Sequence, residues 1–438
     1  MDVERHVEPL AAVAASLRSG ERDPHEYVRT LLDRAATLDP EIRALCEEPD
    51  REERVRADLC ATVERFDGGD RPPLYGVPVG VKDIVDVRGL LTRAGSDVPP
   101  TELTGEEASV VRRLREAGAV PMAKTVTTEF AYMAPGPTRN PHALAHTPGG
   151  SSSGSAAGVA AGLFPLAIGS QTGGSVLRPA AFCGVVGFKP TYDRIPTDGV
   201  VPAAPSLDTL GTFTQDVAGA RLAASVLCDD WEPRDPADVA SPVLGVPADA
   251  YLALTSETAQ ERFERHVDAL EESGYDVRRT DLFADPERAS ESHQTLMRAE
   301  MALAHESWYA AHGDDYRPET AAWIAAGREE SVGALAAARA FAEDLRAHVR
   351  ETAAAAGVDC WVSPAAPGPA PEGLDDTGSS TMNRLWTYAG LPAVSVPAGT
   401  TDAGLPVGLQ CCAGRMDGER LLAWAEGLRT AVDPTAGA

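Results

Sequence analysis

Thr147-Pro-Gly-Gly-Ser-Ser-Ser-Gly-Ser155 and Gly169-Ser-Gln-Thr-Gly-Gly-Ser175 are separated by an apolar run, 156–168. Flexible Gly/Ser linkers usually lie in polar sequence, whereas the second segment continues into the apolar stretch Arg178-Pro-Ala-Ala-Phe-Cys-Gly184. We therefore expect two ordered loops whose backbone N–H groups face a ligand. The apolar run is too short to span a bilayer. We interpret it as a buried core helix, in which the small residues Gly154, Gly158 and Gly162 permit close approach of a neighbouring backbone.

Strand-like and helical stretches alternate around these loops. Runs rich in Gly, Pro and β-branched residues predict strands at 74–87, 120–123, 163–168 and 185–188, and the stretch 106–116 predicts a helix between two of them. Alternation of this kind indicates an α/β fold with a sheet covered by helices on both faces.

The flanking segments complete a single predicted domain over 1–438. Apolar residues at helical spacing predict a helical lead-in over 1–70, and Ala, Glu and Arg-rich sequence predicts long amphipathic helices over 286–355 that cover one side of the sheet. Strand texture returns within 358–438, which we expect to hold C-terminal strands and a helix. No linker or internal repeat interrupts the chain.

The charge balance argues against nucleic acid and membrane partners. The 438 residues carry 39 Lys and Arg against 66 Asp and Glu, a formal net charge of −27. Such a field repels phosphate backbones and anionic lipid surfaces. Lysine occurs only as Lys82, Lys124 and Lys189. An acidic, lysine-poor surface suits high salt, and a GC-rich genome would produce the same bias, so composition leaves both explanations open.

The cysteines and the N-terminus indicate an intracellular protein without a metal framework. The seven cysteines contain no C-x-x-C spacing, so neither a zinc site nor a disulfide framework is expected. The first twenty residues lack a basic region followed by an apolar stretch, so we predict no secretory signal and a cytoplasmic location.

Several known sequence motifs could explain the function of the two loops. A phosphate-binding loop requires a Gly-Lys dipeptide, which the chain lacks. Gly150-Ser-Ser-Ser-Gly154 matches the G-x-S-x-G elbow of serine hydrolases, with Ser152 as nucleophile, but no histidine stands out as its partner. A serine can instead be activated by a neutral lysine. Lys82 ends the apolar run Gly76-Val-Pro-Val-Gly-Val-Lys-Asp83, where its alternative role is a buried ion pair with Asp83.

These segments together resemble the amidase signature hydrolases. The two loops fix the register, because the bridging serine of that family precedes its nucleophile by a set interval, matched here by Ser151 and Ser175. The similarity covers most of the chain from about residue 74. The matching segments are 76–83, 123–130, 148–155, 169–175, 180–191, 390–397 and 404–410.

The resemblance implies an α/β/α sandwich with a large mixed sheet and a catalytic triad of Ser175, Ser151 and Lys82. Ser175 would attack an amide carbonyl, and Ser151 would relay its proton to Lys82. The resemblance further implies a cis peptide at Gly150–Ser151, and Ser170 as the hydroxyl that supports the bridging serine. Backbone N–H groups of Thr172, Gly173, Gly174 and Ser175 would form the oxyanion hole, where glycine leaves room for substrate. No metal or cofactor is required.

The substrate pocket is less closely determined. Many family members have an acid before the Thr-Gly-Gly-Ser segment and arginine two residues after the nucleophile. Here Gln171 and Arg178 replace that pattern, a variant that resembles small stand-alone bacterial amidases such as malonamidase. By that resemblance Arg178 grips a substrate carboxylate, and its alternative role is to brace the loop. Tyr132 and the segment Thr377-Gly-Ser-Ser-Thr-Met-Asn383, with Trp386, are further candidates for the pocket wall.

We therefore expect an amidase that releases ammonia from a small carboxylic acid amide. Lys124 and Lys189 are predicted to be structural, in a buried pair or capping strand ends, and Cys183 a buried apolar residue. One alternative is the glutaminase subunit of a tRNA-dependent amidotransferase. Another is a catalytically silent scaffold. The partner is expected to be a small-molecule amide rather than nucleic acid or membrane. The oligomeric state is open, with a homodimer as one expectation.

Overall fold

A computed structural model describes residues 8–247 and 250–433, so the first seven residues of the predicted helical lead-in lie outside the described part. The described chain forms a ten-stranded mixed sheet in the order β2-β1-β3-β5-β4-β9-β10-β8-β6-β7. The strands are β1 (Pro78–Lys82), β2 (Val120–Thr125), β3 (Leu166–Gln171), β4 (Val186–Lys189), β5 (Thr209–Thr214), β6 (Leu244–Pro247), β7 (Val277–Thr280), β8 (Cys360–Pro364), β9 (Ala393–Thr400) and β10 (Pro406–Ala413).

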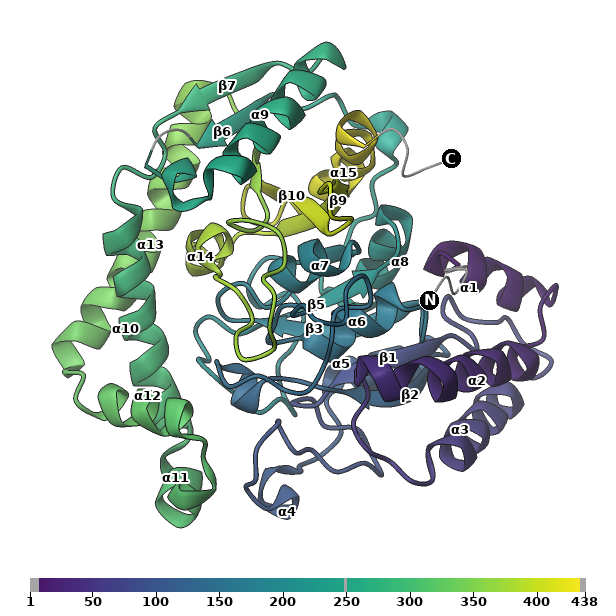
Figure 1. Cartoon of the computed structure of the whole chain (residues 1–438). Helices are drawn as coiled ribbons and strands as arrows, with labels where there is room; N and C mark the ends of the chain where they lie inside the picture. Colours follow the sequence, from purple (N-terminus) through teal and green to yellow (C-terminus); the bar gives the residue numbers. More distant parts are fainter. Residues whose placement is uncertain (1–7, 248–249, 434–438) are drawn as a thin grey trace.

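Helices cover this sheet on both faces, which confirms the predicted fold class. Helices α6 (Ser153–Ala160) and α7 (Leu177–Cys183) contact each other and the central strands, and α8 (Val217–Leu227) and α15 (Gly418–Val432) form a second contacting set. Figure 1 shows the N-terminal helices α1 (Leu10–Ser19), α2 (Pro24–Ile42) and α3 (Arg51–Arg65) at one side of the molecule. Outside the helical cover over 286–355, the structure also describes α4 (Pro100–Leu103), α5 (Ser109–Glu116), α9 (Glu257–Glu272) and α14 (Thr381–Tyr388).

The predicted helical cover over 286–355 is divided into four helices. They are α10 (Pro286–Ala304), α11 (Glu306–His312), α12 (Pro318–Arg328) and α13 (Val332–Ala356). Figure 1 shows α10, α12 and α13 together along the side of the molecule opposite the N-terminal helices. Pro286 and Pro318 each occupy the first helical position, where the missing N–H leaves no intrahelical bond unmade. α10 faces α14, and this contact lets a residue of the cover reach the loop after β3.

Two sequence predictions overlap at 163–168, the end of a buried helix and a strand, and the structure confirms the strand and ends the helix earlier. Helix α6 ends at Ala160, Gly162 adopts a φ of +69°, and β3 begins at Leu166. A left-handed glycine ends the helix and redirects the chain into the sheet. The packing role of the small residues is confirmed: a Cβ on Gly154 would lie 2.1 Å from the Ala44 carbonyl oxygen, and one on Gly158 would lie 2.3 Å from the Phe164 ring.

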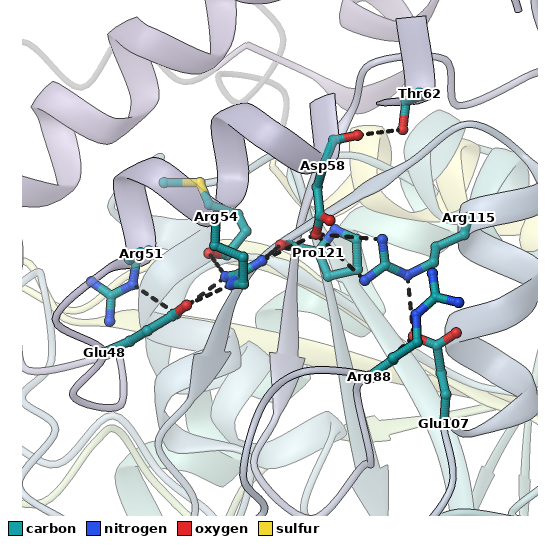
Figure 2. Close-up of polar contacts among 10 residues, drawn as sticks. Glu48, Arg51, Arg54, Asp58, Thr62, Arg88, Glu107, Arg115 and Pro121 are labelled. Atoms are coloured by element: carbon teal, nitrogen blue, oxygen red, sulfur yellow. Dashed lines mark hydrogen bonds and ion pairs between the residues drawn. The ribbon is translucent and has the colours of Figure 1, made fainter. Parts of the chain in front are cut away.

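The N-terminal helix α3 is attached to the edge strand β2 by arginine. Arg54 donates to the carbonyl oxygens of Pro121 (2.8 Å) and Met122 (3.0 Å) and pairs with Glu48 at 2.5 Å. Figure 2 shows the ion pairs continuing through Asp58 to Arg115 of α5. Each guanidinium contacts several acceptors at once, which a lysine ammonium on a flexible stem does less well.

The sheet topology brings the two signature loops together. β1 pairs in parallel with β3, so the carboxyl ends of both strands meet at one edge of the sheet. Lys82 is the last residue of β1, and the loop 172–175 follows the last residue of β3. No described helix is long and apolar enough to cross a membrane.

Candidate active site

Lys82 is fully buried and bonded to two serine hydroxyls. Its Nζ lies 2.6 Å from Ser151 Oγ and 2.8 Å from Ser170 Oγ. No carboxylate of the described residues lies within ion-pair distance of this ammonium group. Burial therefore lowers the pKa of Lys82 to about 7, so that near neutral pH the side chain exists in both its neutral and charged forms.

The other lysines have partners of their own. Asp83, the alternative partner for Lys82, instead pairs with Lys124 at 2.8 Å, and both side chains are buried. Asp83 therefore forms a buried ion pair, as the alternative for Lys82 suggested, but its partner is Lys124. Lys189 donates to the carbonyl oxygens of Pro190 (3.0 Å) and Leu391 (2.6 Å). Lys124 also donates to Thr92 Oγ1 at 3.0 Å, whereas the hydroxyls that contact Lys82 are those of Ser151 and Ser170 in the two signature loops.

The loop before α6 carries Ser151 on a cis peptide bond at Gly150–Ser151, as the resemblance implied. Ser152, the nucleophile of the alternative elbow, is fully buried and its Oγ bonds to the backbone of Ser170 at 3.2 Å. A hydroxyl held in this way is not accessible to substrate, so the elbow interpretation is wrong. Ser170 also differs from expectation, because its hydroxyl contacts Lys82 Nζ directly.

Asp208 is a site residue that sequence reasoning missed. Its carboxylate accepts hydrogen bonds from Thr172 Oγ1 (2.5 Å) and from the backbone N–H groups of Ala203 (2.8 Å) and Ala204 (2.9 Å). Burial raises the pKa of Asp208 to about 6, and these hydrogen bonds and Lys82 act in the opposite direction. In turn, the Asp208 charge raises the pKa of Lys82 against the larger effect of desolvation. The two groups therefore influence each other's protonation.

The loop 172–175 presents three backbone N–H groups without acceptors among the described residues. The carbonyl oxygen of Thr172 accepts from His293 Nε2 (2.8 Å), that of Gly173 from Thr387 Oγ1 (2.7 Å), and that of Gly174 from the Arg178 N–H (3.0 Å). In a trans peptide the N–H points opposite to the C=O. The N–H groups of residues 173, 174 and 175 are therefore turned away from these donors, an arrangement able to bind an oxyanion.

Glycine at position 174 is required by packing against a helix, a constraint that the sequence did not predict. A Cβ at this position would lie 2.5 Å from Asn383 Oδ1 and 2.7 Å from Ser380 Cβ, whereas one at Gly173 would meet nothing closer than 3.5 Å. Glycine at 174 thus permits close packing against α14, and the space for substrate is not the main constraint there.

Gln171 orients both the loop 172–175 and the Thr387 hydroxyl that donates to this loop. Its Oε1 accepts from the N–H groups of Val176 (2.8 Å) and Leu177 (3.0 Å), and its Nε2 donates to Thr387 Oγ1 (2.9 Å). A hydroxyl has a single proton. Because Thr387 already accepts from Gln171, its own proton is free for the carbonyl oxygen of Gly173, the shorter of its two acceptor contacts.

Arg178 is buried and holds the loops that surround the nucleophile. Its guanidinium donates to the carbonyl oxygens of Gly378 and Gly150 at 2.6 Å each and to Thr377 Oγ1 at 3.1 Å. The Gly150 carbonyl belongs to the cis peptide that carries Ser151. Burial lowers the pKa of Arg178 to about 10. These contacts correspond to the bracing role that the sequence offered as an alternative.

A cavity of about 390 Å³, here called the Ser175 cavity, opens beside these groups. Tyr132 lines it and stacks on Trp323 with ring centroids 4.7 Å apart. The segment 377–380 forms another part of the wall, as expected. Trp386 is not part of the wall, because it is fully buried and donates to Tyr251 Oη. Asn383 is likewise buried, donating to Ala365 and Gln410.

Two further residues of this cavity, His293 of α10 and Arg384 of α14, had no signal in the sequence. Burial, with Arg384 nearby, lowers the pKa of His293 to about 3, so the imidazole is neutral at physiological pH. Its contact with the Thr172 carbonyl requires the proton on Nε2. Both residues lie in amphipathic helices, where a polar side chain usually faces solvent.

Comparison with known proteins finds relatives over nearly the whole chain. A family model described as Amidase matches residues 26–422. A glutamyl-tRNA(Gln) amidotransferase subunit of Synechococcus sp. (strain WH7803) is 34% identical, covering 97% of this chain and 97% of its own length. The corresponding subunit from Roseiflexus sp. (strain RS-1) is 31% identical, covering 98% and 97%.

Solved structures show the same architecture. One described as the crystal structure of an amidase matches with a TM-score of 0.88 at 31% identity, covering 97% of this chain and all of the other. The native peptide amidase from Stenotrophomonas maltophilia matches with a TM-score of 0.82 at 27% identity, covering 98% of each chain.

Proposed function

The chain belongs to the amidase family and is a hydrolase of amide C–N bonds, and from this premise we propose that it releases ammonia from a small carboxylic acid amide through an acyl-enzyme on Ser175. The observation that carries the proposal is the contact between Lys82 Nζ and Ser151 Oγ at 2.6 Å. It joins a lysine that is partly neutral near pH 7 to the serine that the family resemblance assigns as the proton relay.

The proposed steps follow from these groups. Ser175 Oγ attacks the amide carbonyl and forms the C–O bond, while its proton passes to Ser151 Oγ and the Ser151 proton passes to Lys82 Nζ. The N–H groups of residues 173–175 stabilise the negative oxygen that develops. The same serine and lysine then return a proton to the leaving nitrogen, and the C–N bond breaks. Water cleaves the ester and restores Ser175.

The volume of the Ser175 cavity limits the size of the substrate. A volume of about 390 Å³ lies in the range of pockets that hold small organic ligands. The stacked pair Tyr132 and Trp323 supplies an apolar wall for the acyl chain. The contacts of Arg178 favour its bracing role over carboxylate binding, since its guanidinium already donates to three oxygen atoms of the chain.

The second candidate function is that of a glutaminase subunit in a tRNA-dependent amidotransferase. It is favoured by the glutamyl-tRNA(Gln) amidotransferase relatives, which match over nearly the whole chain. In this case glutamine would be the amide and a partner protein would receive the ammonia. Glutaminase activity that appears only with a copurifying partner would favour this candidate over a free-standing amidase. A homodimer and a cytoplasmic location stay predictions.

Ammonia release from a panel of neutral amides, dicarboxylic monoamides and glutamine tests the proposal. Ser175→Ala serves as the blank, and a fluorophosphonate probe reports the nucleophile independently of substrate. We expect the probe to label Ser175 in the wild-type protein, and Lys82→Ala to abolish both labelling and ammonia release. A correctly folded wild-type protein that resists the probe would indicate a silent scaffold and overturn the proposal.

A further inference from the structure

The charge of Arg384 has no counter-ion among the described residues. Its guanidinium donates to the hydroxyls of Ser290 and Ser380, the latter at 3.2 Å, and no described carboxylate pairs with it. Neighbouring arginines of the helical cover differ, since Arg298 pairs with Glu330 and Arg339 pairs with Glu300. A half-buried cation with only neutral partners gains stability when an anion completes its surroundings.

Arg384 lies where such an anion can reach it. It lines the Ser175 cavity together with the oxyanion loop, Tyr132 and Trp323. Burial lowers the pKa of Arg384, and the Tyr132 phenol is the neighbour that acts in the opposite direction. Of the five N–H bonds of the guanidinium, two are directed at the serine hydroxyls. The other three have no hydrogen-bond partner among the described residues.

Arg178 has fewer N–H groups available to bind an anion than Arg384 has. Its terminal nitrogens donate to two carbonyl oxygens and one hydroxyl, and its Nε is buried without a partner among the described residues. A carboxylate binding to Arg178 would have to displace contacts that hold the cis peptide and the segment 377–378. Arg384 can bind an anion while keeping both of its hydroxyl contacts.

We infer that Arg384 binds a carboxylate on the acyl portion of the substrate, and that the enzyme prefers amides bearing a second, ionised acid group. This inference rests on the proposed function, since it assigns the specificity of the same cavity. The guanidinium supplies charge-assisted hydrogen bonds to the carboxylate, and the Tyr132–Trp323 wall contacts the intervening methylene groups. The exposed acids Asp375, Asp376 and Glu319 line the same cavity, so a substrate anion needs the positive charge of Arg384 to offset their repulsion.

The test compares matched amides on matched variants. The substrates are the monoamides of succinic, glutaric and adipic acid, each beside the neutral amide of equal chain length. Arg384→Met keeps the length of the side chain and removes its charge. We expect it to lower kcat/KM for the anionic amides about 10- to 100-fold, the range of a charged hydrogen bond, and for the neutral amides less than about threefold. Arg384→Lys should recover part of the difference.

Two controls separate specificity from folding. Arg339→Met removes an arginine of the helical cover whose partner is Glu300, and should change neither series. Arg178→Met should lower both series together, because Arg178 supports the loops. Equal losses on both series in Arg384→Met, or a charge-selective loss in Arg178→Met, would overturn the inference.

A binding measurement decides the case if none of these amides is cleaved. Glutarate should protect Ser175 from the fluorophosphonate at least tenfold better than the uncharged diol of equal length, 1,5-pentanediol, in the wild-type protein, and the difference should vanish in Arg384→Met. Failure of glutarate to protect a reactive Ser175 overturns the carboxylate subsite. Failure of the probe to label Ser175 overturns the proposed function itself.

Discussion

His293 Nε2 lies 2.8 Å from the carbonyl oxygen of Thr172, so a histidine of the helical cover orients the first peptide of the loop that carries Ser175. The contact joins residues separated by 121 positions in the chain. It holds the Thr172 carbonyl on one side of the loop and thereby turns the Gly173 N–H to the other. Helix α10 is therefore part of the structure that prepares the oxyanion hole.

Replacement of His293 should lower kcat more than it changes KM. His293→Leu removes the donor, so the Gly173 N–H loses its fixed direction, and we expect kcat to fall about tenfold or more, below the roughly 10²- to 10³-fold loss from deleting an oxyanion donor. His293→Gln places an amide N–H near the position of Nε2 and should recover most of the loss. Steady-state kinetics of the three proteins provides the measurement.

A transition-state analogue distinguishes this role from simple destabilisation. Its inhibition constant should weaken in His293→Leu in parallel with kcat, whereas a substrate-like competitive inhibitor should bind equally to all three proteins. Equal activity of the Leu and Gln variants, at equal melting temperature, would show that the hydrogen bond to Thr172 does not contribute to catalysis.

The pH dependence of activity should follow Lys82 and respond to Asp208. Lys82 must be neutral to accept a proton, and with a pKa of about 7 its neutral fraction rises as pH increases through 7. We therefore expect kcat/KM of the wild-type enzyme to rise along an acid limb near pH 7. Asp208 favours the charged form of Lys82, so Asp208→Asn should lower the pKa of Lys82 and move this limb to lower pH.

Asp344→Asn is the matched control for this shift. Asp344 is exposed on α13, away from the cavity-lining residues, and its replacement should leave the acid limb in place. An acid limb that moves to higher pH in Asp208→Asn, or does not move although activity is retained, would contradict the assignment of the limb to Lys82.

The direction of the Thr387 hydroxyl provides a third test. Gln171→Glu preserves an acceptor for the N–H groups of Val176 and Leu177, but its carboxylate would accept the Thr387 proton. The Gly173 carbonyl then loses its donor. We expect kcat to fall about tenfold, as in Thr387→Val, while Thr387→Ser retains activity.

A double-mutant cycle measures whether the two residues act through one contact. If Gln171 acts on the loop through Thr387, the Glu substitution should add little once Thr387 is valine. Additive losses in the double variant would instead indicate two independent effects. Melting temperatures of all four proteins show whether the buried carboxylate destabilises the fold.

The parts of the site with local sequence signals could be predicted, and the parts supplied by distant elements could not. Local composition marks the apolar strand that ends at Lys82 and the two glycine-rich loops, but the choice of Ser151 and Ser175 within those loops follows only from the resemblance to the amidase signature family. His293 and Arg384 are single polar residues within helices. Only the packing of α10 and α14 against the loop gives them a role in the Ser175 cavity.

The fold shows the same division. Short β-branched runs predict the loop-flanking strands, but for the apolar run 156–168 the sequence supports a continuous buried helix as well as a strand over 163–168. Periodicity cannot separate a buried helix from a buried strand when both are entirely apolar. The boundary depends on Gly162, whose left-handed φ of +69° becomes visible only in the structure.

The arginine contacts at α3 predict a large difference in stability between two neighbouring arginines. Arg54 joins α3 to β2 through two backbone carbonyls and pairs with Glu48, and its side chain is only 18% exposed. Arg56 lies on the same helix and pairs with Glu52 at 2.6 Å, but both side chains are more than half exposed. Charged hydrogen bonds contribute about 1.5–3 kcal/mol each when partly buried, whereas exposed pairs contribute roughly 0–1 kcal/mol.

Arg54→Met should therefore lower the melting temperature by several degrees, while Arg56→Met should change it little. The loss in Arg54→Met should persist in molar KCl, because bonds to neutral carbonyls are screened less than ion pairs between exposed charges. Arg54→Lys should behave more like Arg54→Met than like the wild type, since an ammonium group cannot match the fork that reaches Pro121, Met122 and Glu48 together. Melting curves of these variants at low and high salt decide the matter. Equal melting temperatures for Arg54→Met and Arg56→Met would mean that the carbonyl contacts do not hold α3 on β2.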